Sequence, residues 1–147
     1  MSKGIGRLFQ VGIAKETTRG TAISSAAYWI PFSELALEEK DSKIVDDQSY
    51  GVIEDSQNQT ITKQWAEGKM KAPIGDRHFP LILLSVLGSL STTTNADASG
   101  NVRDHTITVA QSAQHQSLTY FLDDPLSGAD YKNANGVIEN LEIHYDM

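Results

Sequence analysis

The chain has 147 residues, no cysteine, and 19 acidic against 12 basic residues, which gives a formal net charge of −7. This length predicts a single domain over residues 1–147, and the lack of cysteine excludes a disulfide-rich scaffold and a thiolate metal site. Proteins that hold DNA or RNA tightly use clustered Lys and Arg, whereas the basic residues here are scattered, so we expect no tight nucleic-acid binding. The chain shows neither a signal-peptide pattern nor a membrane-length apolar run, which predicts a soluble protein made in the cytoplasm.

The first part of the chain predicts extended segments separated by a loop. Residues 8–13 favour a short strand, and residues 15–25, rich in Thr, Gly, Ser and Ala, favour a loop with a tight turn at Arg19-Gly20. Residues 28–31 end in proline, and the residue before a proline is held out of the helical region, so this segment should be extended. Residues 34–38 are too few to separate a helical turn from a strand.

Residues 41–56 predict a long irregular segment that mixes acidic and apolar side chains. Loops of this length in a compact domain are usually functional or disordered. A purely disordered linker lacks so much apolar surface. We therefore expect this segment to dock on another surface.

The middle of the chain predicts a hairpin followed by a helix. Residues 60–65 and 69–74 alternate in the manner of two antiparallel strands around a turn at Glu67-Gly68. Residues 79–90 predict a helix with Asp76 as its N-cap. Because this helix is apolar nearly all round, we expect it to be covered on more than one side.

The remaining residues predict three strands and an exposed loop. The loop is expected over residues 92–101, the first two strands over residues 105–109 and 117–122, and the last strand over residues 137–145. An open edge on the last strand would be a template for pairing with another chain. Its apolar side, and so the candidate edge for assembly, consists of Val137, Leu141, Ile143 and Tyr145.

One helix among six or seven strands predicts a mostly-β (α+β) fold, a β-sandwich or split barrel with one packed α-helix. The four histidines are far apart and match no metal-ligand spacing. The Asp46-Asp47 and Asp123-Asp124 pairs are typical of turns. We therefore predict no catalytic, cofactor-binding or metal-binding residue and no enzyme activity. The aromatic residues leave open a second hypothesis, a carbohydrate- or receptor-binding β-sandwich module.

A resemblance to a known family bears on these alternatives. Residues 11–22, Val-Gly-Ile-Ala-Lys-Glu-Thr-Thr-Arg-Gly-Thr-Ala, resemble the opening motif of the tail tube proteins, or major tail proteins, of long-tailed bacteriophages. Residues 28–31 are similar to the extended aromatic-x-Pro segment that follows it in the family. Residues 65–88 resemble its strand, glycine, strand and helix, and Ser117-Leu118-Thr119 and Gly136-Val137 match later landmarks. The resemblance spans nearly the whole chain.

The resemblance implies a virion structural protein that assembles in the host cytoplasm into hexameric rings stacked as a tail tube. Its partners would be other copies and other tail proteins, and genomic DNA would pass through the lumen without tight binding. Members of the family generally continue well past a strand such as residues 137–145, so this chain is expected to be truncated or a short relative. The long loop would reach the adjacent ring through Asp46, Asp47, Tyr50, Val52, Glu54 and Asp55.

Overall fold

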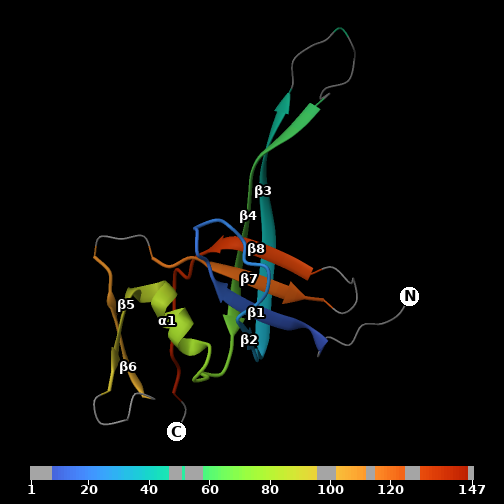
Figure 1. The fold of residues 1–147 in the computed structure, drawn as a ribbon. Helices are drawn as coiled ribbons and strands as arrows, with labels where there is room; N and C mark the ends of the chain where they lie inside the picture. The colour runs from blue at the N-terminus through green and yellow to red at the C-terminus, as the bar shows by residue number, and fades with distance from the viewer. Residues whose placement is uncertain are drawn as a thin grey trace. The chain divides into compact units, whose positions relative to one another are not determined.

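The computed structural model describes residues 8–46, 51, 58–95, 102–111, 115–124 and 130–145. The chain divides into two compact units (Figure 1), of which the first comprises Met1–Pro31 with Pro73–Met147 and the second comprises Phe32–Ala72. Each unit is a separate set of contacts and is described by itself.

The first unit is built on a four-stranded antiparallel sheet of order β2-β1-β7-β8. Its strands are β1 (Gln10–Lys15), β2 (Tyr28–Ile30), β7 (Leu118–Asp123) and β8 (Asp130–Gly136). The two central strands are buried at most of their positions, on both faces, from Val11 to Ala14 in β1 and at Leu118, Thr119, Phe121 and Leu122 in β7. The buried apolar residues of the unit are Val11, Ile13, Ala14, Ile30, Leu84, Leu118, Phe121 and Leu122.

Helix α1 (Phe79–Leu87) belongs to the same unit. His78 rather than Asp76 occupies its N-cap and makes no side-chain capping bond, and Pro80 lies in the first turn, where the missing N–H costs no helical hydrogen bond. Gly88 ends the helix by donating its N–H to the carbonyl oxygen of Leu84. The hydroxyl of Ser85, which is fully buried, donates to the carbonyl oxygen of Gln116 over 2.9 Å and so ties the helix to the residues that precede β7.

A two-stranded hairpin follows the helix without a linker. Strand β5 (Gly88–Thr94) begins at the residue that ends α1 and pairs antiparallel with β6 (Arg103–Val109). The amide of Ala110 donates to the carbonyl oxygen of Leu87 over 2.6 Å, which fixes the base of this hairpin to the helix. The strand predicted over residues 105–109 is therefore confirmed, and its partner is β5.

The second unit is one long antiparallel hairpin. Strand β3 (Glu34–Asp46) pairs with β4 (Asn58–Lys71) from Glu34 opposite Lys71 to Asp46 opposite Asn58, with a shift of register between Ser42 and Lys43. Residues 34–38 are thus a strand. Residues 41–46, predicted to belong to an irregular segment, are the second half of the same strand.

The predicted mostly-β fold is confirmed, with one helix in the described part of the chain. Within the described residues the strands form one four-stranded sheet and two hairpins, and none of these sheets closes into a barrel. No helix in this part of the chain is long and apolar enough to cross a membrane.

The hairpin predicted around Glu67-Gly68 is wrong, because β4 runs straight through both residues. Gly68 is needed for a reason other than a turn. A Cβ at this position would lie 2.4 Å from the carbonyl oxygen of Ala36 and 3.0 Å from Cδ1 of Leu37. The glycine therefore allows β3 to approach β4 closely, with the Leu37 side chain against it.

The strand predicted over residues 137–145 is also wrong. These residues, with the candidate edge residues Val137, Leu141, Ile143 and Tyr145, form no ladder with any described residue, and the strand beside β7 is β8, just before them. Alternation of apolar residues indicates which side a strand would bury, but not whether a sheet edge is available to it.

Candidate self-association surfaces

The β3–β4 hairpin has no buried residue among those whose side chains are described. Only Leu35, Lys40, Trp65 and Met70 within its two strands are half-buried, and the rest are exposed. Side chains alternate between the two sides of a strand and paired residues share a side. The register therefore divides the hairpin into two faces of different chemistry.

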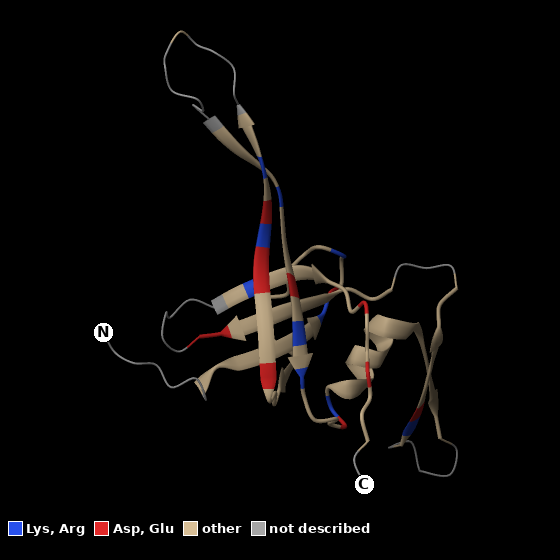
Figure 2. Ribbon diagram, turned by 180° about the vertical axis from the view of Figure 1, so that it is seen from behind, with Lys and Arg blue, Asp and Glu red and all other residues tan. Residues whose placement is uncertain are grey.

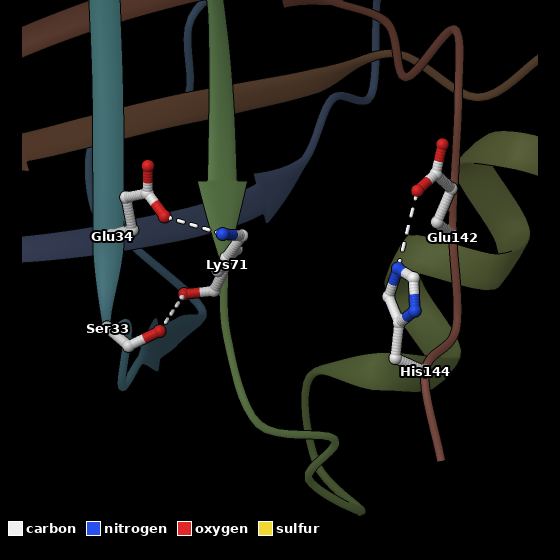
Figure 3. A network of polar contacts seen from close by, with 5 residues as sticks. All are labelled: Ser33, Glu34, Lys71, Glu142 and His144. Atoms are coloured by element: carbon white, nitrogen blue, oxygen red, sulfur yellow. Dashed lines mark hydrogen bonds and ion pairs between the residues drawn. The ribbon is translucent and has the colours of Figure 1, made fainter. Parts of the chain in front are cut away.

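The charged face of the hairpin is defined here as Glu34, Glu38, Lys40, Lys63, Trp65, Glu67, Lys69 and Lys71. Lys40 pairs with Glu67 over 2.5 Å, and Lys71 pairs with Glu34 over 2.8 Å (Figure 3). These partners lower the pKa of both carboxyls and raise the pKa of both lysines. The ion pairs are exposed, so they contribute little to stability but fix the pattern of charge.

The same face is reinforced around Trp65. The indole N–H of Trp65 donates to Glu67 over 2.7 Å. The Lys63 ammonium lies 4.8 Å from the centroid of the indole ring, in cation–π geometry. The strands also differ in charge, because β3 is mainly acidic and β4 mainly basic (Figure 2). The two outer edges of the hairpin therefore present opposite signs.

The apolar face of the hairpin is defined here as Leu35, Leu37, Ala66, Gly68 and Met70. Leu37 is 42% exposed although it lies against Gly68. Polar and charged residues then follow on the same side of the ladder, and beyond the register shift it carries Val45 and Ile61, which are 45% and 49% exposed. The group formed by Leu35, Leu37, Ala66 and Met70 at the base of the hairpin is therefore a candidate surface for contact with another protein.

The four-stranded sheet leaves both of its outer strands without a further partner in the described part of the chain. Its β2 edge carries Tyr28 and Trp29, which are exposed, and its β8 edge carries exposed Tyr131. Unpaired strand edges are templates for pairing with another chain. The β5–β6 hairpin adds a further open ribbon, with exposed Leu90 and Val109.

A buried carboxylate organises the loop that precedes β2. Glu16 is only 2% exposed. One of its oxygens accepts hydrogen bonds from the Gly20 N–H (2.8 Å) and the Ser117 hydroxyl (2.7 Å). The other accepts from the Asn135 N–H (2.7 Å) and the Thr119 hydroxyl (3.0 Å). These five residues are called the Glu16 cluster below.

The Glu16 cluster explains part of the sequence pattern at residues 16–20. Gly20 has a φ of 80°, a conformation that favours glycine, and this turn points its N–H at the carboxylate four residues earlier. Burial raises the pKa of Glu16, but hydrogen bonds from Ser117, Asn135, Gly20 and Thr119 together hold the pKa below its ordinary value of 4.5. A carboxylate that is fully engaged in this way is a structural group and not a free acid or base.

An open hollow of about 210 Å³ adjoins this cluster. Its lining includes Arg19 and His115 as well as Glu16. The Arg19 side chain donates through Nε to the side-chain oxygen of Asn135 over 2.9 Å. Glu16 and Ser117, two residues of this lining, thus belong to the cluster, and Arg19 is bonded to a third member.

The residues that the sequence singled out are only partly placed. Asp46 is the last residue of β3, whereas Asp47, Tyr50, Val52, Glu54 and Asp55 lie outside the described residues. Within residues 8–46, 51, 58–95, 102–111, 115–124 and 130–145, no three His, Asp or Glu side chains are grouped to hold a metal ion. The ring of His105 lies within hydrogen-bond distance of the Thr92 hydroxyl (2.9 Å), and that of His144 within hydrogen-bond distance of the Glu142 carboxylate (3.3 Å). These two histidines therefore contact different partners.

The sequence did not predict two features, the role of Glu16 and the apolar face of the hairpin. The role of Glu16 depends on donors about a hundred residues away, and only its spacing to Gly20 is a local signal. The apolar face of the hairpin was not predicted because residues 34–46 and 58–71 were not recognised as partner strands.

A scan against protein-family models finds no match for the chain, and no curated protein matches it in sequence.

Proposed function

We propose that the protein is a virion structural protein, a tail tube subunit that self-associates into stacked hexameric rings through which genomic DNA passes. The observation that carries this proposal is the β3–β4 hairpin. Its strands of 13 and 14 residues pair only with each other among the described residues and expose both faces. The resemblance of residues 11–22 to the tail tube family supplies the kind of assembly.

A two-stranded hairpin is marginally stable in water by itself, and three or more strands or a packed face are needed for independent stability. The apolar face offers Leu35, Leu37 and Met70 for such packing. The fixed charges of the charged face favour a partner whose charged side chains are complementary to them. Both features suit an element that neighbouring subunits cover. Contacts between different patches of identical subunits close into a ring when the rotation allows, and rings then stack.

The charge of the chain supports passage of DNA rather than its retention. The formal net charge is −7, and phosphate is repelled by carboxylates within about 8 Å at physiological salt. Binding of a nucleic acid requires Lys and Arg that displace condensed counterions. The lysines on the charged face are in part already paired with Glu34 and Glu67. A tube lumen lined by carboxylates would repel the DNA phosphates and so let the DNA pass without binding it.

Shortening the hairpin tests the proposal. Glu39 and Ala66 face each other across the two strands, so residues 40–65 can be replaced by Asn-Gly, the preferred two-residue hairpin turn. This variant retains Trp29 as its one tryptophan, whose fluorescence reports on the first unit. We expect the intact chain to form rings or tubes by electron microscopy and the shortened variant to form none while its Trp29 emission stays native.

A matched control replaces Lys63 by alanine in the full-length hairpin, which removes a side chain but keeps both strands, and this variant should still assemble. A monodisperse monomer for the intact chain at high concentration, or rings that survive the shortening, would contradict the proposal.

A further inference from the structure

Residues 137–145 have the pattern of a β-strand but belong to none of the sheets formed by the described residues. The side chains of Asn140 and His144 both contact the carboxylate of Glu142, over 3.2 and 3.3 Å (Figure 3 shows the His144 pair). Contacts between residues two apart require an extended backbone with these three side chains on one side. No ladder hydrogen bond to this segment is formed within the described part of the chain.

The opposite side of the segment is apolar. It carries Leu141, Ile143 and Tyr145, of which Ile143 is 59% and Tyr145 85% exposed. An extended segment with one apolar side and free peptide groups is suited to β-augmentation, in which it adds a strand to an open sheet edge. Main-chain hydrogen bonds then supply affinity, and alternate side chains supply selectivity.

The outer edge of β4 has matching chemistry. Strand β4 pairs only with β3 in the described part of the chain, so its other edge is open. Lys69 on the charged face has no ion-pair partner among the described side chains, whereas Lys71 is paired with Glu34. Ala66, Gly68 and Met70 lie on the apolar face, where the Leu37 side chain of β3 packs against Gly68 and stays 42% exposed.

We propose that residues 140–145 of one copy add to β4 of a second copy as an antiparallel third strand, with Glu142 opposite Lys69. This register places His144 opposite Glu67 on the charged face. On the apolar face it places Leu141 opposite Met70, and Ile143 opposite Gly68, where Ile143 would add to the exposed apolar surface of Leu37. Opposite charges and apolar pairs directly across two strands are each stabilising.

Other antiparallel registers are less favourable. A slip by one residue would turn Ile143 and Tyr145 toward the charged face. A slip by two residues would place Glu142 opposite Glu67 in one direction, or opposite the already paired Lys71 in the other. The charges therefore select the register.

We assign the recipient edge to a second copy of the chain because of the type of contact involved. Segment and edge are different surfaces of the same chain, so each copy offers one donor and one recipient and the contact is heterologous. Such contacts repeat from subunit to subunit and close into a ring when the rotation between subunits allows it. The inference therefore rests on the proposed self-association and specifies the pair of elements through which it occurs.

Disulfide cross-linking of mixed single-cysteine variants tests the inference directly, because the natural chain has no cysteine. Glu142→Cys and Lys69→Cys change exposed side chains. The two proteins, one carrying a size tag, are mixed and oxidised, and the linked peptides are identified by mass spectrometry. We expect a mixed dimer joined between positions 142 and 69, at least about tenfold more abundant than with Lys63→Cys, which lies on the same face of β4 six residues away.

Three results would overturn the inference: no mixed dimer, equal cross-linking to Lys63→Cys, or a disulfide formed only within one chain of the Glu142→Cys/Lys69→Cys double variant. A second measurement reverses the charges. Glu142→Lys should weaken association several-fold, and Lys69→Glu in the same chain should restore it; failure of the restoration counts against the register. Rings without the cross-link would refute this pairing alone, whereas the cross-link in a sample without rings would refute only the tube.

Discussion

The four-stranded sheet and the β3–β4 hairpin differ in the burial of their carboxylates and in the partners that these carboxylates contact. In the sheet unit, Glu16 is buried and each of its oxygens accepts two hydrogen bonds from the same chain. In the hairpin, Glu34 and Glu67 are exposed and their ion pairs span only the two strands. The first unit therefore satisfies its buried carboxylate and forms its apolar core within one chain, whereas the hairpin has no buried residue among its described side chains.

The largest expected effect is the loss of stability when a leucine of the first unit is replaced by aspartate. The same replacement in the hairpin serves as the comparison. Leu84 on α1 is 7% exposed, and Leu84→Asp would bury an unpaired carboxylate at a cost of several kcal/mol. Since a domain of this size is stable by only about 5–15 kcal/mol, we expect the variant to be unfolded or nearly so. Circular dichroism and thermal unfolding would measure this.

The matched control is Leu37→Asp on the apolar face of the hairpin. Leu37 is half exposed, so the carboxylate stays solvated and the melting temperature should change little, while association should be lost. Equal destabilisation by the two substitutions would erase the distinction between the regions.

Glu16→Gln is the next largest change. Each oxygen of Glu16 accepts from one backbone N–H, of Gly20 or Asn135, so either orientation of a glutamine amide would point its NH₂ at a backbone donor. The loss of charged hydrogen bonds at a buried site should lower the free energy of unfolding by about 2–3 kcal/mol. Glu39→Gln, on the exposed hairpin, is the control and should leave chemical denaturation curves unchanged.

The same carboxylate predicts a smaller, pH-dependent effect. Because the folded-state pKa of Glu16 is lowered below 4.5, its contribution to stability is present above the pKa of the unfolded chain and is lost as the pH falls through the folded-state pKa. Denaturant unfolding between about pH 5 and 2 should show a steeper decline for the natural protein than for Glu16→Gln. Parallel declines would mean that Glu16 does not gain its charge-dependent contacts.

The smallest expected effect concerns an ion pair of the hairpin. Lys40 and Glu67 are in contact but both side chains are well exposed, and such pairs contribute little because solvent screens them. Lys40→Ala should leave the melting temperature unchanged within error. A clear drop would show that the charged face stabilises the isolated subunit.

The sequence predicted those elements whose signals are local. The extended segment before Pro31 and the strand at residues 117–122 both appear, at nearly the expected positions, in β2 and β7. The helix was predicted because apolar residues follow Pro80, although it ends at Leu87, three residues early.

The remaining errors concern pairing between distant residues. Gly68 was interpreted as a turn, whereas it is a point of close approach to Leu37, and this depends on a partner strand that no local pattern identifies. Strand β8 was missed because its polar sequence, Asp-Tyr-Lys-Asn-Ala-Asn-Gly, carries little strand propensity. It is fixed instead by its ladder to β7 and by the Asn135 amide bound to Glu16.

Hydrogen exchange on separated monomer and assembled fractions tests most directly whether neighbours complete the hairpin. The account predicts that amides of β1 and β7 are protected in both fractions, because those strands are paired on both sides within the chain. Amides of β4 that face its open edge should exchange rapidly in the monomer and slowly after assembly. Equal protection of β4 in the two fractions would contradict the account.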